Sequence, residues 1–160
     1  MIGIMSDSHD NIIKIKRAVE IFNEKKCELV IHAGDFIAPF AVRELEKLNC
    51  PIKAVYGNCD GEKLGLKKAF SSVGEIQEPP LIFEYNNLKI FVCHVQNNLD
   101  NLAHCGKFNI IIYGHTHEPK AERKNNTLVL NPGETCGWLS GKGTIALIDP
   151  VKISWNFIEL

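Results

Sequence analysis

Residues 1–10 read MIGIMSDSHD, an apolar run of five residues that passes into a polar turn. Apolar residues then recur at steps of three and four, namely Ile12, Ile15, Val19 and Phe22. This spacing is typical of a helix with one buried face, and Asp10 or Asn11 can accept hydrogen bonds from the free N–H groups of its first turn. The segment therefore predicts a buried strand, a polar loop and an amphipathic helix.

A similar alternation continues through the first half of the chain. A second apolar run covers residues 29–32, a helical pattern follows at 42–48, and a third apolar run covers 52–56. Strands that are apolar along their whole length and joined by helices are typical of a parallel sheet with right-handed crossovers. We therefore predict such a sheet, followed by a further helix at 63–70.

The second half of the chain has the pattern of hairpins. Asparagine pairs suited to two-residue turns, Asn86-Asn87 and Asn125-Asn126, separate apolar or alternating segments. Further predicted elements are strands at 81–85, 88–93, 109–113, 143–149 and 152–157, and a short helix from Leu99 that stops at Gly106. Together with the first half, these predict an α/β fold of two facing mixed β-sheets flanked by helices, in a single domain over residues 1–160.

Composition narrows the class of protein. The 160 residues are 45% hydrophobic and 23% charged, which excludes a disordered or fibrous chain. A net charge of −1 provides no overall positive field for a polyanion, so we expect no extended nucleic-acid surface. The apolar runs are far shorter than the roughly 20 residues of a membrane span. The six cysteines form no C-x-x-C pair, and we expect a soluble, cytoplasmic protein with reduced thiols.

Side chains that bind metals follow the ends of the predicted strands. They are Asp7, His9, Asp35, Asn58, Asp60, His94, His115 and His117. Sites in α/β sheets form beyond the carboxyl ends of the strands, so the fold would bring these residues into one crevice. Within Asp7-x-His9 and His115-x-His117, alternate residues of an extended backbone would point to the same side. The nitrogen and oxygen donors suit Mn²⁺, Fe²⁺, Ni²⁺, Co²⁺ or Zn²⁺ better than Ca²⁺ or Mg²⁺.

Five short motifs occur in order along the chain: Asp7-Ser8-His9, Gly34-Asp35, Gly57-Asn58-Cys59-Asp60, His94 and Gly114-His115-Thr116-His117. In this order they resemble the signature of the calcineurin-like metallophosphoesterases. The length, the form of residues 57–60 and the segment 131–134 (NPGE) are similar to those of the small single-domain bacterial and archaeal phosphodiesterases of that superfamily. The resemblance covers residues 3 to about 137 and implies an αββα sandwich.

The resemblance also implies a dinuclear site. One metal ion would be held by Asp7, His9, Asp35 and His117, and the second by Asp35, Asn58, His94 and His115. A hydroxide bridging the two ions would attack the phosphorus of a small phosphodiester substrate. Two divalent ions carry four positive charges, and the two carboxylates and the hydroxide carry three negative ones. About one net positive charge therefore remains to attract the anionic diester. Of the candidate metals, Mn²⁺ or Ni²⁺ is favoured, and a homodimer is compatible with a domain of this type.

Three residues are candidates for catalysis beside the metals: Asn58, Cys59 and Asp60. Many relatives carry a histidine at the position of Cys59, where it protonates the leaving group. A thiol, with a pKa of about 8.5, is a poorer acid at neutral pH than an imidazole with a pKa of about 6.5. We therefore expect a preference for esters with good leaving groups. Val95 stands where the family usually has glycine, and its side chain would narrow the crevice or shift the His94 backbone.

Alternative interpretations are open at this point. Asp60 could be a structural acceptor that fixes its loop, and His32 a hydrogen-bonded core residue. The chain could be a phosphomonoesterase of the same fold. It could also be a non-catalytic protein-binding scaffold that resembles the small retromer subunit, although each of its predicted ligand positions holds an Asp, His or Asn.

Overall fold

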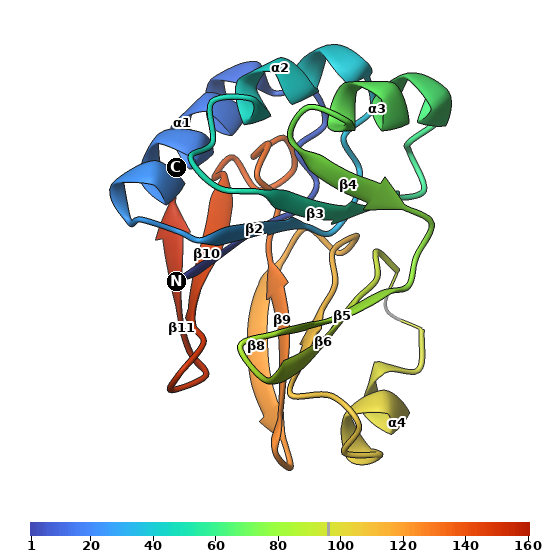
Figure 1. Cartoon of the computed structure of the whole chain (residues 1–160), viewed down its shortest axis with the longest axis vertical. Coiled ribbons are helices and arrows are strands. Elements are labelled where there is room, and N and C mark those ends of the chain that lie inside the picture. The colour runs from blue at the N-terminus through green and yellow to red at the C-terminus, as the bar shows by residue number, and fades with distance from the viewer. Residues whose placement is uncertain (96) are drawn as a thin grey trace.

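Two sheets face each other in the computed structural model, which describes residues 1–95 and 97–160 (Figure 1). The first sheet contains β1 (Ile2–Met5), β2 (Leu29–His32), β3 (Ile52–Val55), β4 (Gly74–Gln77), β10 (Thr144–Asp149) and β11 (Ser154–Glu159). The second contains β5 (Leu81–Tyr85), β6 (Leu88–Val92), β7 (Ile110–Ile112), β8 (Pro119–Lys124) and β9 (Thr127–Pro132). Their strand orders are β11-β10-β1-β2-β3-β4 and β5-β6-β7-β9-β8, so the two predicted mixed sheets are confirmed.

The first sheet is built from the strand–helix alternation of the first half. β1 to β4 run parallel, whereas β10 and β11 pair antiparallel at the other edge. The crossover helices α1 (Ile12–Glu24), α2 (Val42–Leu45) and α3 (Lys63–Phe70) lie on the outer face of this sheet (Figure 1). Asn11 caps α1, because its Oδ1 accepts the Lys14 N–H at 3.3 Å. The parallel sheet and the helix at 63–70 are therefore confirmed.

Two hairpins frame the second sheet. β5 and β6 are joined by Asn86 and Asn87, both in the left-handed region with φ of 49° and 62°. β8 and β9 are joined through Asn125, whose φ is 53°. Asparagine tolerates this conformation better than most residues, which explains why both asparagine pairs form tight turns. The helix α4 (Leu99–His104) packs on the outer face of this sheet and, as predicted, stops before Gly106.

Apolar side chains fill three layers. Between the sheets, residues such as Ile4, Ile31 and Ile112 are fully buried. A second layer separates the first sheet from α1, α2 and α3, and a third lies between the second sheet and α4. In the second layer, α1 lies very close to β1: a Cβ on Gly3 of β1 would be 2.5 Å from the ring of Phe22 in α1. The absence of a side chain at Gly3 therefore lets helix α1 pack directly against β1.

Several predicted bounds shift by one residue at an end, and three elements differ further from the sequence-based prediction. Strand β4 was not predicted, because its sequence GEIQ contains a single apolar residue, Ile76, and it is an edge strand. The predicted helix at 42–48 is a 3₁₀ turn (Pro39–Ala41) followed by the four residues of α2. Strand β11 begins at Ser154 rather than residue 152, because the preceding Ile153 has a φ of 49° and belongs to the turn.

Within the described part of the chain, no helix has the length and apolar character needed to cross a bilayer.

Candidate metal centre

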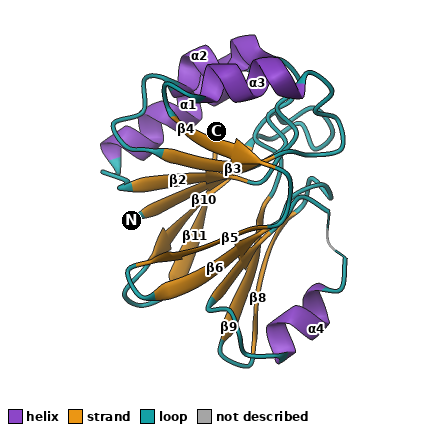
Figure 2. Cartoon of the chain, turned by 45° about the vertical axis from the view of Figure 1, so that its right-hand side comes forward, coloured by secondary structure: helices purple, strands orange, loops and turns teal. Residues whose placement is uncertain are grey.

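The loops that follow the strands gather at one side of the molecule, where the ends of both sheets converge (Figure 2). The segments after β1, β2 and β3 come from the first sheet, and those after β6 and β7 come from the second. They carry the predicted ligands Asp7, His9, Asp35, Asn58, His94, His115 and His117. Contacts of 4 Å or less link all seven side chains into one cluster.

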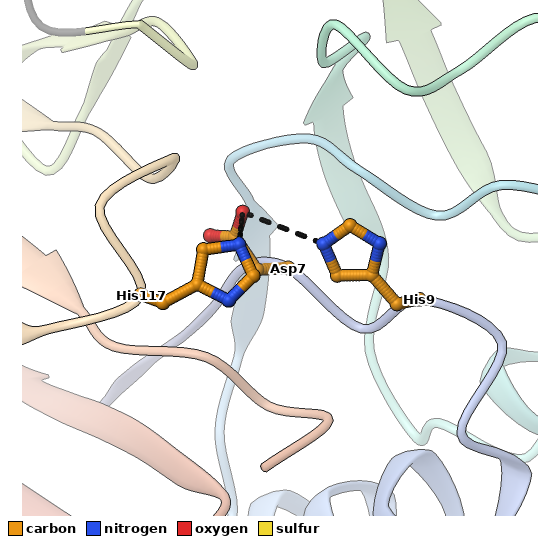
Figure 3. Close-up of side chains that lie close together, drawn as sticks. All are labelled: Asp7, His9 and His117. Atoms are coloured by element: carbon orange, nitrogen blue, oxygen red, sulfur yellow. Dashed lines mark ion pairs between the residues drawn. The ribbon is translucent and has the colours of Figure 1, made fainter. Parts of the chain in front are cut away.

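The first half of the cluster is formed by Asp7, His9 and His117. The Asp7 carboxylate lies between the two imidazoles, with Oδ1 3.4 Å from His117 Nε2 and 3.9 Å from His9 Nε2 (Figure 3). The two rings stack with centroids 5.1 Å apart. Asp7 and His9 are far from His117 in the sequence, yet the three residues offer one oxygen and two nitrogens to a common point.

Asp35 occupies the middle of the cluster. Its Oδ2 lies 3.6 Å from His9 Nε2 on one side and 3.3 Å from His94 Nε2 on the other. Beyond it, Asn58 Oδ1 lies 3.0 Å from His94 Nε2 and 2.9 Å from His115 Nδ1. The Asp35 carboxylate thus lies between His9 and His94. Asp7 Oδ1 also lies 3.9 Å from His94 Nε2, but Asp35 makes the shorter contacts to both imidazoles and is the better placed carboxylate for a ligand shared by two ions.

Hydrogen bonds orient two of the imidazoles. His94 Nδ1 donates to the carbonyl oxygen of Ala33 at 2.7 Å, and His117 Nδ1 donates to Glu134 Oε2 at 2.8 Å. With Nδ1 bonded in this way, Nε2 is the ring nitrogen that faces the cluster in both residues. Histidine ligands of metals are commonly held in this way.

The donor set fits a metal ion by an independent criterion. His9 Nε2 is buried but has no hydrogen-bond partner among the residues that the structure describes. It lies 3.6 Å and 3.9 Å from the carboxylate oxygens of Asp35 and Asp7, which is too far for strong hydrogen bonds. Two ligands at roughly 2.1 Å from one ion would be about 3 Å apart. A cation among these atoms would satisfy His9 and offset the buried carboxylates.

Electrostatics agree with this fit. Burial raises the pKa of the Asp7 carboxyl, which is fully inaccessible to solvent. Burial also acts to raise the pKa of Asp35, but the nearby His94 imidazole and the Cys59 N–H, which donates to Oδ1 at 2.8 Å, outweigh it and lower this pKa. Nearby positive charge favours both carboxylates in the ionised form.

The backbone positions the ligands differently from our expectation. We expected an extended backbone through Asp7-x-His9 and His115-x-His117, and this expectation is wrong. Asp7, His9, His115 and His117 have φ values of 51°, 37°, 70° and 62°. The four residues lie in left-handed turns, a conformation that occurs at functional sites. The side chains converge because of these turns and not because of strand alternation.

Asp60 contacts the backbone of two ligand loops. Its carboxylate accepts the N–H groups of Asp35, Phe36, Ile37 and Gly57 at 2.7–3.1 Å. The residue is 3% exposed and ties the loop of Asp35 to the loop of Asn58. These contacts are those of the structural alternative, and a catalytic role for Asp60 stays a prediction.

Cys59 and Val95, the two departures from the family pattern, lie at the surface of the site. The Cys59 Sγ accepts a hydrogen bond from Asn58 Nδ2 at 3.3 Å. Although the residue as a whole is exposed, partial desolvation of the thiol and the neighbouring Asp35 carboxylate raise its pKa to about 11. Val95 is 38% exposed, and the His94 imidazole next to it still reaches Asp35.

Glu134 and His32 support the cluster, and we did not predict the role of Glu134. The buried Glu134 carboxylate accepts from His117 Nδ1 and from the Ser140 N–H; burial alone would raise its pKa, but these bonds lower it to about 2. The sequence held a clue to this role, because Glu134 follows the end of β9 just as the candidate ligands follow the ends of their strands.

His32, which we expected in the core, is buried. Its ring nitrogens lie 3.0 Å from Ser8 Oγ and 3.1 Å from the Gly34 N, whose N–H donates to Nδ1.

We expect Glu134→Gln to weaken metal binding by about 10- to 100-fold, the usual effect of removing a supporting group of this kind. The neutral amide would hold the His117 ring less firmly and make its Nε2 less basic. The dissociation constant for Mn²⁺, measured by isothermal titration calorimetry, checks this. Glu118→Gln makes the same charge change at an exposed residue beside His117 and should leave the constant unchanged. Equal affinities of both variants and the parent chain would contradict the role of Glu134.

The chain belongs to the calcineurin-like phosphoesterase superfamily, whose domain matches residues 1–152. The fold of two mixed sheets with flanking helices agrees with this family. Membership was expected from the five ordered motifs, and it is confirmed.

The chain is similar to a curated phosphodiesterase and to solved structures. The phosphodiesterase MJ0936 of Methanocaldococcus jannaschii is 43% identical over 163 residues, which cover 99% of this chain and 98% of that protein. The solved structure of an archaeal phosphodiesterase is 41% identical, superposes with a TM-score of 0.94 and covers 99% of both chains. Vps29 of Chaetomium thermophilum has a TM-score of 0.72 over 99% of this chain and 95% of its own, but at 14% identity this likeness shows the fold alone.

Proposed function

We propose that the chain is a metal-dependent phosphodiesterase that works with two divalent transition-metal ions. The observation that carries the proposal is the place of Asp35, with one oxygen between His9 and His94 at 3.6 Å and 3.3 Å. A shared carboxylate between two groups of donors is the arrangement that a pair of ions needs. The 43% identity to a phosphodiesterase over nearly the whole of both chains supports the class of reaction.

The residues of the chain would divide the work as follows. Asp7, His9, Asp35 and His117 would hold one ion, and Asp35, Asn58, His94 and His115 the other. Bound ions of this kind supply an activated water at neutral pH and positive charge next to the phosphoryl oxygens. The ligand set contains only two carboxylates, and its imidazoles and amide are neutral. It therefore keeps enough positive charge in the site to attract a diester anion.

The ligands also bear on the identity of the metal. Four imidazole nitrogens together with carboxylate and amide oxygens suit first-row transition metals better than Ca²⁺ or Mg²⁺. Our proposal includes Mn²⁺ or Ni²⁺ as the favoured ions.

The test uses protein freed of metal and bis(p-nitrophenyl) phosphate. We expect no turnover before metal is added, turnover after addition of Mn²⁺ or Ni²⁺, and loss of activity with a chelator. p-Nitrophenyl phosphate, the monoester with the same leaving group, should react more slowly, and a faster reaction would favour the phosphomonoesterase alternative. Absence of turnover with each of the five candidate metals would overturn the proposal in favour of a non-catalytic scaffold.

Cys59 should limit the enzyme to esters with good leaving groups. An imidazole, with an ordinary pKa of about 6.5, protonates a leaving alkoxide better at neutral pH than the Cys59 thiol, whose pKa is raised to about 11. We therefore expect Cys59→His to accelerate hydrolysis of alkyl phosphodiesters by about 100-fold, the lower end of general-acid effects. Rates for bis(p-nitrophenyl) phosphate should change little. Equal changes in the hydrolysis rates of aryl and alkyl phosphodiesters would contradict this role of residue 59. Cys59→Ser, which removes the thiol without adding an imidazole, is the control.

Location and assembly complete the proposal. All six cysteines are free thiols, which supports a reducing compartment, and we propose the cytoplasm. A homodimer stays a prediction, to be measured by sedimentation velocity.

A further inference from the structure

A cavity of about 360 Å³ opens beside Asn58 and His94, the ligands proposed for the second ion. Its volume is in the range of sites that bind small organic groups. We propose that this cavity receives a neutral, aromatic ester substituent of the substrate, which makes aryl or nucleoside-type phosphodiesters the substrate class. The inference rests on the proposed function, since it assumes that the phosphoryl group lies at the metal centre.

The walls of the cavity come from both sheets. Tyr56 follows β3, the prolines Pro79 and Pro80 precede β5, and Phe91 lies in β6. Val95 adds an apolar surface that is 38% open to solvent. Rings and branched side chains on several sides form a pocket suited to a flat apolar group, and the prolines offer no N–H donors to a polar one.

The charge of the walls argues against a second phosphate. The acidic residue Glu78 lies in the lining, and its carboxylate is paired with Lys63 Nζ at 2.9 Å. The described lining residues include no Lys or Arg. Lys63 does not line the cavity; its Nζ lies 5.3 Å from the centre of the Tyr56 ring, and its carbonyl oxygen accepts a hydrogen bond from the Tyr56 hydroxyl. A polyphosphate chain would therefore find no unpaired cation there.

The position of the cavity connects it to the chemistry. Asn58 Oδ1 and His94 Nε2 are 3.0 Å apart, so the residues that border the cavity also border the metal centre. A diester whose phosphoryl group lies at this centre can place one substituent directly in the cavity. Monoesters of small alcohols and inorganic phosphate have no group to fill it.

The test compares two anions that cannot be hydrolysed, diphenylphosphinate and dimethylphosphinate. Both carry one negative charge, so they differ only in the groups offered to the cavity. Isothermal titration calorimetry on the Mn²⁺-loaded protein should give at least a 10-fold tighter dissociation constant for the diphenyl compound, which is about 1.4 kcal/mol. Val95→Asp should reduce this ratio to about threefold or less, because it places a carboxylate at the apolar wall. Val151→Asp, at a residue that is 89% exposed in the turn before β11, is the matched control and should leave the ratio unchanged.

The ratio of the two constants decides the inference. A ratio within about twofold in the parent chain, or a ratio that Val95→Asp leaves unchanged, would overturn it. A general loss of metal binding in the variant would weaken both anions equally and would not mimic the expected result. If the parent chain hydrolyses bis(p-nitrophenyl) phosphate and binds both phosphinates equally, the pocket assignment fails while the proposed function stands. Absence of hydrolysis with every candidate metal would instead remove the proposed function itself.

Discussion

Asp35→Asn is expected to abolish hydrolysis, with kcat/KM for bis(p-nitrophenyl) phosphate falling by at least about 10³-fold, or about 4 kcal/mol of transition-state stabilisation. The amide keeps the shape of the side chain but removes the charge between His9 Nε2 and His94 Nε2. In the proposed site both ions share this carboxylate, so a single substitution would impair the binding of both. Steady-state kinetics over a Mn²⁺ titration measures the loss, and metal analysis should show fewer bound ions.

Asp149→Asn serves as the control for Asp35→Asn. The Asp149 carboxylate accepts the N–H groups of Val151 and Lys152 in the turn between β10 and β11, and the residue contributes nothing to the ligand cluster. Its replacement should leave kcat/KM within about twofold of the parent value. A loss of less than about tenfold in Asp35→Asn, at saturating metal, would contradict the shared-ligand role.

Gly57→Ala is expected to reduce activity by about 100-fold or more, although the change adds only one methyl group. A Cβ at this position would overlap the Asp35 carboxylate, whose Cγ would be 2.7 Å away. Since buried atoms are closely packed, the carboxylate would have to move away from its two imidazole neighbours. Even a small displacement of a group at a reacting centre lowers the reaction rate strongly. Kinetics and the Mn²⁺ dissociation constant together measure the effect.

Gly61→Ala is the matched control, because it makes the same change in the same loop. A Cβ on Gly61 would meet nothing within 4 Å, and we expect activity within about twofold of the parent chain. Thermal melting of both variants separates local displacement from unfolding. If Gly57→Ala and Gly61→Ala have equal activity and equal metal affinity, the close packing against Asp35 does not control the site.

Much of the fold follows from local patterns. Burial is indicated directly by the apolar runs at β1, β2 and β3 and by the helical spacing of apolar residues in α1. The asparagine pairs indicate the hairpin turns. Strand β4 could not be predicted in this way, because an edge strand with only Ile76 buried has almost no apolar pattern. Its place in the sheet depends on pairing with β3, which is a tertiary interaction. The short α2 likewise depends on its surroundings more than on helical spacing.

The clustering of the candidate ligands could be predicted from the sequence, but the geometry of the cluster could not. Metal-binding side chains at the ends of strands drew attention to the residues that now lie together. The left-handed turns at Asp7 and His9 could not be inferred, because neither residue type requires a positive φ. A sequence also does not show toward which groups a buried carboxylate side chain points. Asp60 faces backbone N–H groups and Glu134 faces His117, and only the three-dimensional packing distinguishes these contacts from ligation.

The proposed pair of metal ions can be located in a crystal structure of the Mn²⁺-loaded protein, with anomalous scattering recorded near the manganese edge. We predict two anomalous peaks about 3.5–4 Å apart, with the Asp35 carboxylate in contact with both. We also predict His9 and His117 at one peak and His94 and His115 at the other. A single peak, or a pair of peaks that Asp35 does not bridge, would contradict the proposed dinuclear site.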